Sequence, residues 1–346
     1  MSNYSVNDIS KIAIHNVGNK VNDEGLYLSK KVAVFNNNLK NILLSYFVSS
    51  FKSNEYFNLY HDSDLSLNEI YVYVTKIFEK PNSIFEQSVS IAKHLYNSST
   101  HPNIKGGEFY TVFFKDCEFE GKSVEAIGLF KSESKDTFLK VNPTDEFYEI
   151  ESDSGININK LDKGCLIFNT EKENGYVVAV VDNSSRGQDA VYWVDSFLQL
   201  TQRQDNYHNT KNLLSLYKKF VTKELPQEYE VTKADQADFL NKSIQFFKEK
   251  DSFDLEEFTH EVIQQPELIK RFNTFKDDYQ NETETIIDDN FTISESAFKK
   301  QVRVLKSILK LDKNFHIYIH GNREMIEQGV EKDGRKYYKI YYNEEN

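Results

Sequence analysis

Residues 108–133 read EFYTVFFKDCEFEGKSVEAIGLFKSE, which is the clearest indication of a β-sheet in the chain. Two runs rich in β-branched and aromatic residues flank the short polar segment EGK, as expected of two strands joined by a hairpin turn. Further runs of this kind follow as TFLKV (137–141), GININKLDKGCLIFN (155–169) and GYVVAVVD (175–182). Because the connecting segments PTDE and KENG are equally short, we predict an antiparallel meander over residues 106–181.

The residues on either side of this sheet indicate helices and a few more strands. The chain opens with strand-like runs at 11–17 and 25–35, and apolar residues then recur at helical spacing in three segments, the third introduced by Ser83. Beyond the sheet, apolar residues again recur at helical spacing. This spacing predicts helices around 213–220, 239–247, 258–263, 267–275 and 296–313, followed by the strands NFHIYIH (314–320) and RKYYKIYYN (335–343).

These patterns predict an α+β fold in two domains. Residues 1–200 are expected to form an α+β domain with helices and the antiparallel meander. Residues 201–346 are expected to form a mainly helical domain that closes with terminal strands in a short hairpin-like element. The boundary is expected near residues 195–210.

The composition is that of a globular protein. The chain has 346 residues, of which 26 are Phe and 21 are Tyr, so a core can form without a disulfide or a metal. Cys117 and Cys165 form no CxxC pair, which favours a reducing cytoplasm and argues against a zinc site. The segment MSNYSVNDISK lacks the pattern of a signal peptide, and no window has the roughly 18 apolar residues of a membrane span. We therefore expect a soluble cytoplasmic protein that does not contact membranes.

The formal charge of −12 is distributed unevenly along the sequence. Residues 232–293 contain seven basic and fifteen acidic residues, a net charge of −8, whereas residues 294–313 contain six basic and two acidic residues, a net charge of +4. An acidic protein is a poor general ligand for nucleic acid, because cationic side chains supply most of the nonspecific affinity. The segregation nevertheless leaves one basic segment that could meet a polyanion.

Within that segment, SAFKKQVRVLKSILKLDK (296–313), the charges follow one side of the predicted helix. An apolar stripe of Phe298, Val302, Leu305 and Leu309 would dock the helix, and a row of cations lies about a quarter-turn away. Such a row can contact successive phosphates of duplex DNA. The candidate phosphate-binding residues are Lys299, Lys300, Arg303, Lys306, Lys310 and Lys313.

Two interpretations of the basic segment that involve no nucleic acid stay open. Lysines beside a buried stripe commonly keep a helix soluble. The neighbouring acidic segment at 232–293 could also neutralise the row within the molecule.

No established catalytic or metal-binding motif is present. The chain has no GxSxG, HExxH, GxxxxGK[ST] or GxGxxG. His316 and His320 would share one face of a strand, but the spacing fixes no further ligand, and a solvated strand face is the simpler interpretation. The acids of DLEEFTHE (254–261) fit a solvated helical face. We predict no catalytic residue, metal or cofactor, and leave open only a nuclease whose carboxylates are assembled by folding.

Four segments resemble one known family. They are KHLYNSSTHPNIKGGEFYTVFF (93–114), GININKLDKGCLIFN (155–169), DAVYWVDSFL (189–198) and SAFKKQVRVLKSILKLDKNFHI (296–317). In this order they resemble the bacterial nucleoid-associated protein family (NdpA-like), in its Bacteroidetes-type form, from about residue 9 to residue 342. The resemblance implies a non-enzymatic DNA-associated protein of the cytoplasm and nucleoid, and transfers no catalytic residue.

The shared segments also have local interpretations. In LDKG, Gly164 could permit a tight turn or bulge while Asp162 accepts hydrogen bonds from the turn backbone. Tyr192 and Trp193 fit core or interface positions better than a base-stacking platform, because no basic residue interleaves with them. Arg186 lies on a polar loop and could approach a phosphate.

The leading hypothesis is therefore a non-enzymatic, nucleoid-associated protein that contacts double-stranded DNA without sequence specificity. The alternative is an acidic interaction protein that binds a DNA-processing enzyme and reaches the nucleoid indirectly. The sequence also leaves a homo-oligomer open.

Overall fold

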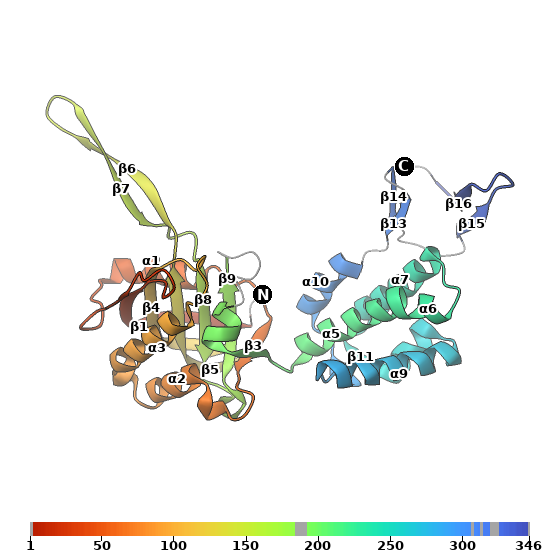
Figure 1. The fold of residues 1–346 in the computed structure, drawn as a ribbon, viewed down its shortest axis with the longest axis horizontal. Coiled ribbons are helices and arrows are strands. Elements are labelled where there is room, and N and C mark those ends of the chain that lie inside the picture. Colours follow the sequence, from red (N-terminus) through yellow and green to blue (C-terminus); the bar gives the residue numbers. More distant parts are fainter. Residues whose placement is uncertain (1–2, 184–191, 306–307, 312–313, 319–324, 345–346) are drawn as a thin grey trace. The chain divides into compact units, whose positions relative to one another are not determined.

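The computed structural model describes residues 3–183, 192–305, 308–311, 314–318 and 325–344. The chain divides into two compact units, unit 1 (Met1–Arg203) and unit 2 (Gln204–Asn346), shown in Figure 1. Unit 1 combines an antiparallel sheet with helices. Unit 2 is mainly helical with short terminal strands, so the predicted fold class is confirmed.

Unit 1 is built on an eight-stranded antiparallel sheet with the strand order β10-β3-β9-β8-β5-β4-β1-β2. The predicted meander forms its centre, because β4, β5, β8 and β9 are neighbours in the order of the chain. Strand β1 pairs along β4 from Tyr4 opposite Phe119 to Val17 opposite Gly107. The strands are β1 (Tyr4–Val17), β2 (Leu26–Leu28), β3 (Tyr56–Leu59), β4 (Gly107–Phe119), β5 (Lys122–Ser132), β8 (Lys163–Phe168), β9 (Val177–Asp182) and β10 (Leu200–Gln202).

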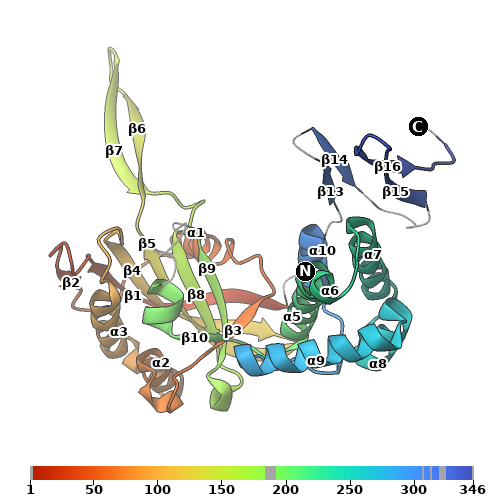
Figure 2. The same cartoon turned by 45° about the vertical axis from the view of Figure 1, so that its right-hand side comes forward.

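Both faces of this sheet are buried, which explains the nearly continuous apolar runs in its strands. One face packs against α2 (Glu69–Glu79), α3 (Ile84–Ser98) and the π-helical segment Tyr192–Leu198. The other face packs against α1 (Asn37–Val48). Along β4, Phe109 and Phe113 contribute to the first core, and Tyr110 and Phe114 to the second. The helices are seen in Figures 1 and 2.

Two predicted strands of unit 1 differ from the structure. The run at 25–35 is a strand only at Leu26–Leu28, because the next backbone N–H, that of Ser29, donates to Nδ1 of His15 (3.2 Å) instead of continuing the ladder. The TFLKV run does not join the meander. It belongs to β6 (Lys135–Pro143), which pairs with β7 (Tyr148–Ile156) in a separate hairpin that projects from unit 1 in Figure 1.

Gly164 has a different role from the predicted turn or bulge. It lies inside β8 opposite Phe130, and a Cβ at this position would lie 2.7 Å from Cδ1 of Phe130 and 3.0 Å from Cδ2 of Leu161. Phe130 is fully buried and its ring stacks on Phe47 (centroids 4.4 Å apart). Glycine is therefore required here for close packing, since a methyl group would displace a fixed aromatic ring.

Unit 2 packs its helices around an aromatic core that includes Tyr217, Phe246, Phe258 and Phe272. Polar caps begin several of these helices. Thr232 and Asp235 form a reciprocal capping box at the start of α7, and Asp205 caps α5. The helices are α5 (Asn206–Lys219), α6 (Leu225–Glu228), α7 (Lys233–Glu249), α8 (Leu255–Phe258), α9 (Pro266–Thr283) and α10 (Glu295–Leu305).

The predicted helix at 296–313 is too long. Helix α10 ends at Leu305, and β13 (Ile308–Leu311) follows, paired with β14 (Phe315–Tyr318). A short apolar run fits both the helical and the extended period, and here a neighbouring strand supplies the backbone hydrogen bonds that decide between them. The last strand, β16 (Lys336–Ile340), pairs with β15 (Ile326–Val330) and forms a second terminal hairpin. Unit 2 has one further strand pair, β11 (Ser252–Asp254) with β12 (Asn290–Thr292).

None of the helices in the described part of the chain combines the length and the apolar character needed to span a bilayer.

Replacing Gly164 with Ala should lower the free energy of unfolding by about 1–3 kcal/mol, because the added methyl group overlaps the buried ring of Phe130. Urea denaturation of the full chain measures the change. The double variant Gly164→Ala/Phe130→Leu should be less destabilised than the sum of the two single changes, since the smaller side chain makes room. Strict additivity would contradict the packing role.

The buried side chain of His15 should make unit 1 sensitive to acid. Its Nδ1 accepts from Ser29, and its Nε2 lies 2.9 Å from Oγ of Ser88, whose hydroxyl donates to the Phe85 carbonyl. Both contacts fit a neutral ring, and burial lowers the pKa of His15 from 6.5. The unfolded chain then binds the proton more readily, so this stability is complete above pH 6.5 and is lost as the pH falls below it.

Denaturation of His15→Gln from about pH 7.5 to about pH 5 should therefore show a smaller loss of unfolding free energy than the unmodified chain shows. The same substitution at the exposed His260 of unit 2 is the control. An equal acid loss in the His15→Gln variant would contradict the assignment.

Candidate nucleic-acid interface

Helix α10 is fixed at its start by Ser294 and along one side by apolar packing. The Ser294 carbonyl accepts from the N–H of Phe298 (2.9 Å), and its hydroxyl lies 3.4 Å from the N–H of Ala297. Ala297 and Leu305 are buried, and Phe298 stacks on Phe247 of α7 (centroids 6.1 Å apart). The apolar stripe thus docks α10 over the part that is helical, and leaves its other side to solvent.

A groove of about 880 Å³ lies between α10 and the end of α7. Its apolar lining includes Phe247, Phe298 and Val302, and four cations stand along it. These cations are Lys248, Lys250, Lys299 and Arg303, and the acids beside them are Asp251 and Glu295. The lining therefore carries an excess of positive charge on a protein whose overall charge is −12.

The α10 cations differ in how strongly they are engaged. Lys299 pairs with Glu295 one turn earlier (2.6 Å), with 70% of the lysine side chain exposed. Exposed pairs of this kind contribute little free energy, so a phosphate can compete for the lysine. Lys300 lies 3.4 Å from the Tyr207 hydroxyl and above that ring. Arg303 is exposed and has no ion-pair partner among the described residues.

The structure places only part of the predicted phosphate-binding row on one helix. Lys299, Lys300 and Arg303 lie on α10, and Lys310 lies on β13, where only the backbone is described. Lys306 and Lys313 lie outside the described residues, as does Arg186. The helical ridge of cations is therefore wrong at Lys310, which lies on a strand, while its first part on α10 is present and faces solvent.

Sequence reasoning missed Lys248 and Lys250, which approach α10 only through the tertiary packing of α7. Lys250 donates to Glu257 (2.6 Å) and Glu261 (3.0 Å), and these hydrogen bonds raise its pKa. The run FFKEKD already carries both lysines, but nothing in the sequence indicates which helix they face. Since Lys250 is engaged by two carboxylates, Lys248 is the stronger addition to the interface.

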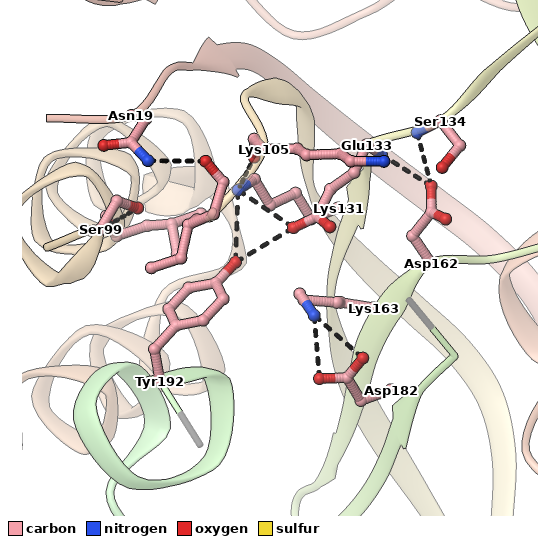
Figure 3. Close-up of polar contacts among 12 residues, drawn as sticks. Asn19, Ser99, Lys105, Lys131, Glu133, Ser134, Asp162, Lys163, Asp182 and Tyr192 are labelled. Carbon is pink, nitrogen blue, oxygen red and sulfur yellow. Dashed lines mark hydrogen bonds and ion pairs between the residues drawn. The ribbon is translucent and has the colours of Figure 1, made fainter. Parts of the chain in front are cut away.

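Unit 1 contains a second concentration of charge, which is buried and shown in Figure 3. Nζ of Lys131 donates to the Lys105 carbonyl (2.6 Å) and lies 3.3 Å from both the Tyr192 hydroxyl and Oε1 of Glu133. Nζ of Lys163 lies 2.9 Å from both carboxylate oxygens of Asp182. Burial lowers the pKa of Lys131, and Glu133 opposes that shift.

The ring of Tyr192 lies near both buried ammonium groups, 5.6 Å from Nζ of Lys131 and 5.4 Å from Nζ of Lys163. Its hydroxyl donates to Glu133 (3.2 Å), and burial raises the pKa of Tyr192. Trp193 is fully buried against Phe197. Tyr192 and Trp193 are therefore core residues, as predicted, and present no surface to a base.

Asp162 of the LDKG segment holds the base of the β6–β7 hairpin. Its Oδ2 accepts the backbone N–H groups of Glu133 (2.7 Å) and Ser134 (2.9 Å), the two residues that lead from β5 into β6. Because Asp162 itself lies between β7 and β8, this carboxylate ties both legs of the hairpin together (Figure 3). The predicted hydrogen bonding to backbone is present, but it reaches across the sheet and not within a local turn.

Across the described ranges, no group of three or more His, Cys, Asp or Glu side chains is arranged to hold a metal ion. His316 is exposed on β14, and His320 lies outside those ranges.

The sequence matches the model of the family described as "Nucleoid-associated protein YejK" over residues 13–335. The match begins within β1 and covers the other strands of the sheet of unit 1, together with the helices of unit 2, including α10. It confirms the resemblance to nucleoid-associated proteins. No curated protein matches the chain.

Replacing Asp162 with Ala should lower the free energy of unfolding by about 2 kcal/mol or more, because two backbone N–H groups lose their shared acceptor. Asp162→Asn should cost less, since one amide oxygen can replace Oδ2. Urea denaturation gives the free energies, and hydrogen exchange at residues 133 and 134 should accelerate in the Ala variant. Equal stability of the Ala and Asn variants would contradict this role of the carboxylate.

Proposed function

Because the chain belongs to the family of nucleoid-associated protein YejK, we propose that it binds duplex DNA through phosphate contacts made by unit 2. The contacting residues are Lys299, Lys300 and Arg303 of α10, together with Lys306, Lys310 and Lys313 of the following segment. Lys248 of α7 joins them across the groove. The contacts are made to the backbone and read no base sequence.

The exposure of Lys299 and Arg303 on a docked helix is the observation that carries the proposal. The two residues are four positions apart, so about 6 Å separates them along the helix axis, close to the spacing of phosphates along a strand. The buried residues Ala297 and Leu305 hold this helix in place. Two cations are therefore presented without the cost of ordering a flexible segment.

The net negative charge of the chain is compatible with DNA contact at one localised basic site. The net charge of −12 disfavours contact with DNA over the surface in general, so we expect the contact where cations are concentrated, as in the basic groove. The role is architectural and non-enzymatic, and its place is the nucleoid in the cytoplasm. Affinity is expected to depend strongly on salt, because each neutralised phosphate releases counterions.

A second candidate is an interaction protein that presents an acidic surface to a basic DNA-processing partner. A smaller hollow of about 400 Å³ supports it, because Glu230, Asp235 and Asp238 line it with Lys242 as the only cation in that lining. This candidate would place the chain at the nucleoid through its partner.

Reversing two charges, in Lys299→Glu/Arg303→Glu, should weaken binding to a random duplex by about tenfold or more at low salt. The slope of log affinity against log salt concentration should also fall by roughly 2, because each phosphate contact contributes about 0.9. Mobility shift or anisotropy titration across a salt series measures both quantities. The loss should be similar on duplexes of different sequence.

Lys122→Glu/Lys160→Glu is the matched control, since it changes the net charge equally at exposed positions of unit 1. Equal weakening by both double variants would reduce the effect to net charge and contradict a localised contact. If nucleic-acid-free protein does not bind DNA at low salt, yet localises to the nucleoid in cells, the acidic interaction surface is favoured.

A further inference from the structure

The β6–β7 hairpin has one apolar and one charged face. Residues directly opposite each other in an antiparallel pair point to the same side. Val141 faces Ile150, Leu139 faces Ser152, and Pro143 faces Tyr148. The side chains between them point to the other face, which carries Phe138 together with Asp136, Lys140, Glu149, Glu151 and Asp153.

No described residue of unit 1 covers the apolar face. Leu139 is 69% exposed, Val141 56%, Tyr148 71% and Ile150 67%. These four side chains are adjacent in the ladder and make a patch on the order of 400 Å², which is as large as the main apolar patch of many monomers. A two-stranded ribbon in water gains little stability by itself, so this patch indicates an interaction surface.

The base of the hairpin is held firmly. Asp162 ties its two legs, Lys135 pairs with Glu108 of β4 (2.7 Å), and Asn157 donates to Asp136 (2.7 Å). On the charged face Lys140 pairs with Asp153 (2.7 Å). A partner would thus meet a pre-formed ribbon, and binding would cost little conformational entropy.

We propose that the apolar face of the β6–β7 hairpin is a self-association surface, on which the hairpins of two copies of this chain pack face to face. Such packing of two sheets brings their apolar faces to about 10 Å and leaves the charged faces in solvent. A two-fold axis between the hairpins makes the patch its own complement.

The charge of the hairpin favours a second copy of this chain over other possible partners of the apolar face. Residues 135–156 contain two lysines and six acids, a net charge of −4, which repels DNA and anionic membranes. The acids lie on the opposite face and in the tip loop, so a basic protein would find no carboxylate within the patch itself. A second copy offers an apolar ladder of the same width, and the one lysine on this face, Lys135, lies at its base, where it is paired with Glu108.

The surface area that two copies would bury limits the affinity of the proposed dimer. Two copies would bury on the order of 800 Å², less than the roughly 1,200–2,000 Å² of a standard stable interface. The dimer is therefore weak and forms with rising concentration. If the proposed DNA binding also holds, neighbouring copies on one duplex have a raised effective concentration, and hairpin pairing would link them.

Sedimentation velocity of the full chain without DNA tests the surface over a concentration series up to about 500 µM. The unmodified chain should dimerise reversibly. Val141→Thr/Ile150→Thr, which keeps β-branched residues, should raise the dissociation constant by about tenfold or more. Lys140→Thr/Glu151→Thr on the charged face is the matched control and should leave it unchanged.

Cysteine crosslinking distinguishes a lost contact from an unfolded hairpin. Cys117 and Cys165 are buried, so an added surface cysteine reports on the hairpin. Under mild oxidation, Ser152→Cys on the apolar face should give covalent dimers, and Glu151→Cys on the charged face should not. Lys299→Glu/Arg303→Glu should dimerise normally, which separates this proposal from DNA binding.

Three results would overturn the proposal. The first is a monomer at every concentration. The second is a dimer that is insensitive to Val141→Thr/Ile150→Thr, with equal crosslinking from both cysteine positions. The third is retention of the chain by zwitterionic lipid vesicles that is lost in the same double variant, which would make the patch a lipid-binding surface.

Discussion

The burial of the eight-stranded sheet on both faces is the constraint on which the rest of unit 1 depends. Phe109 and Phe113 must fit under α2 and α3 while Tyr110 and Phe114 fit against α1, so β4 tolerates no charge at these positions. Another ring of the second core, Phe130, depends on glycine at position 164, because any side chain there would meet it. The centre of the sheet therefore has only a packing role.

Two buried lysines, each paired with a carboxylate, lie at one end of the sheet. Lys131 and Lys163 are almost fully buried, and burying an ammonium group is unfavourable unless it is paired. Each has a carboxylate partner, and the Tyr192 ring lies near both. The adjacent Asp162 carboxylate satisfies two backbone groups at the point where the chain leaves the sheet. This arrangement fixes where the hairpin emerges, and links the LDKG and YW segments through contacts that stabilise structure.

Unit 2 separates its charges by position on its surface. The groove beside α10 carries more cations than acids, whereas the charged residues lining the hollow beside α7 and α9 are three acids and one lysine. Lys299 and Arg303 are exposed, in contrast to Lys131 and Lys163 of unit 1, which are engaged in buried pairs. Exposed cations over a buried apolar stripe are available to a polyanion, because their surface pairs are weak. The proposed phosphate contact would use this part of the surface on a chain of overall negative charge.

The amino-acid sequence determined the elements whose period and composition are unambiguous. The runs of 108–133 predicted a hairpin of the central sheet, and the apolar spacing of Phe298, Val302 and Leu305 predicted the docked face of α10. These signals are local, because each residue type is selected by the period of its own element. The family could also be identified from segments of sequence alone.

The tertiary structure decided what depends on neighbours distant in the chain. Helix α10 ends at Leu305 and Ile308–Leu311 pair with a strand, so Lys310 does not continue the helical row of cations. The tertiary structure placed Lys248 and Arg303 in the lining of one groove, and it placed β6 and β7 outside the sheet, where Leu139 and Ile150 are exposed. Hydrogen bonding and burial at these positions come from residues that local periodicity does not encode, which is why the sequence by itself could not assign them.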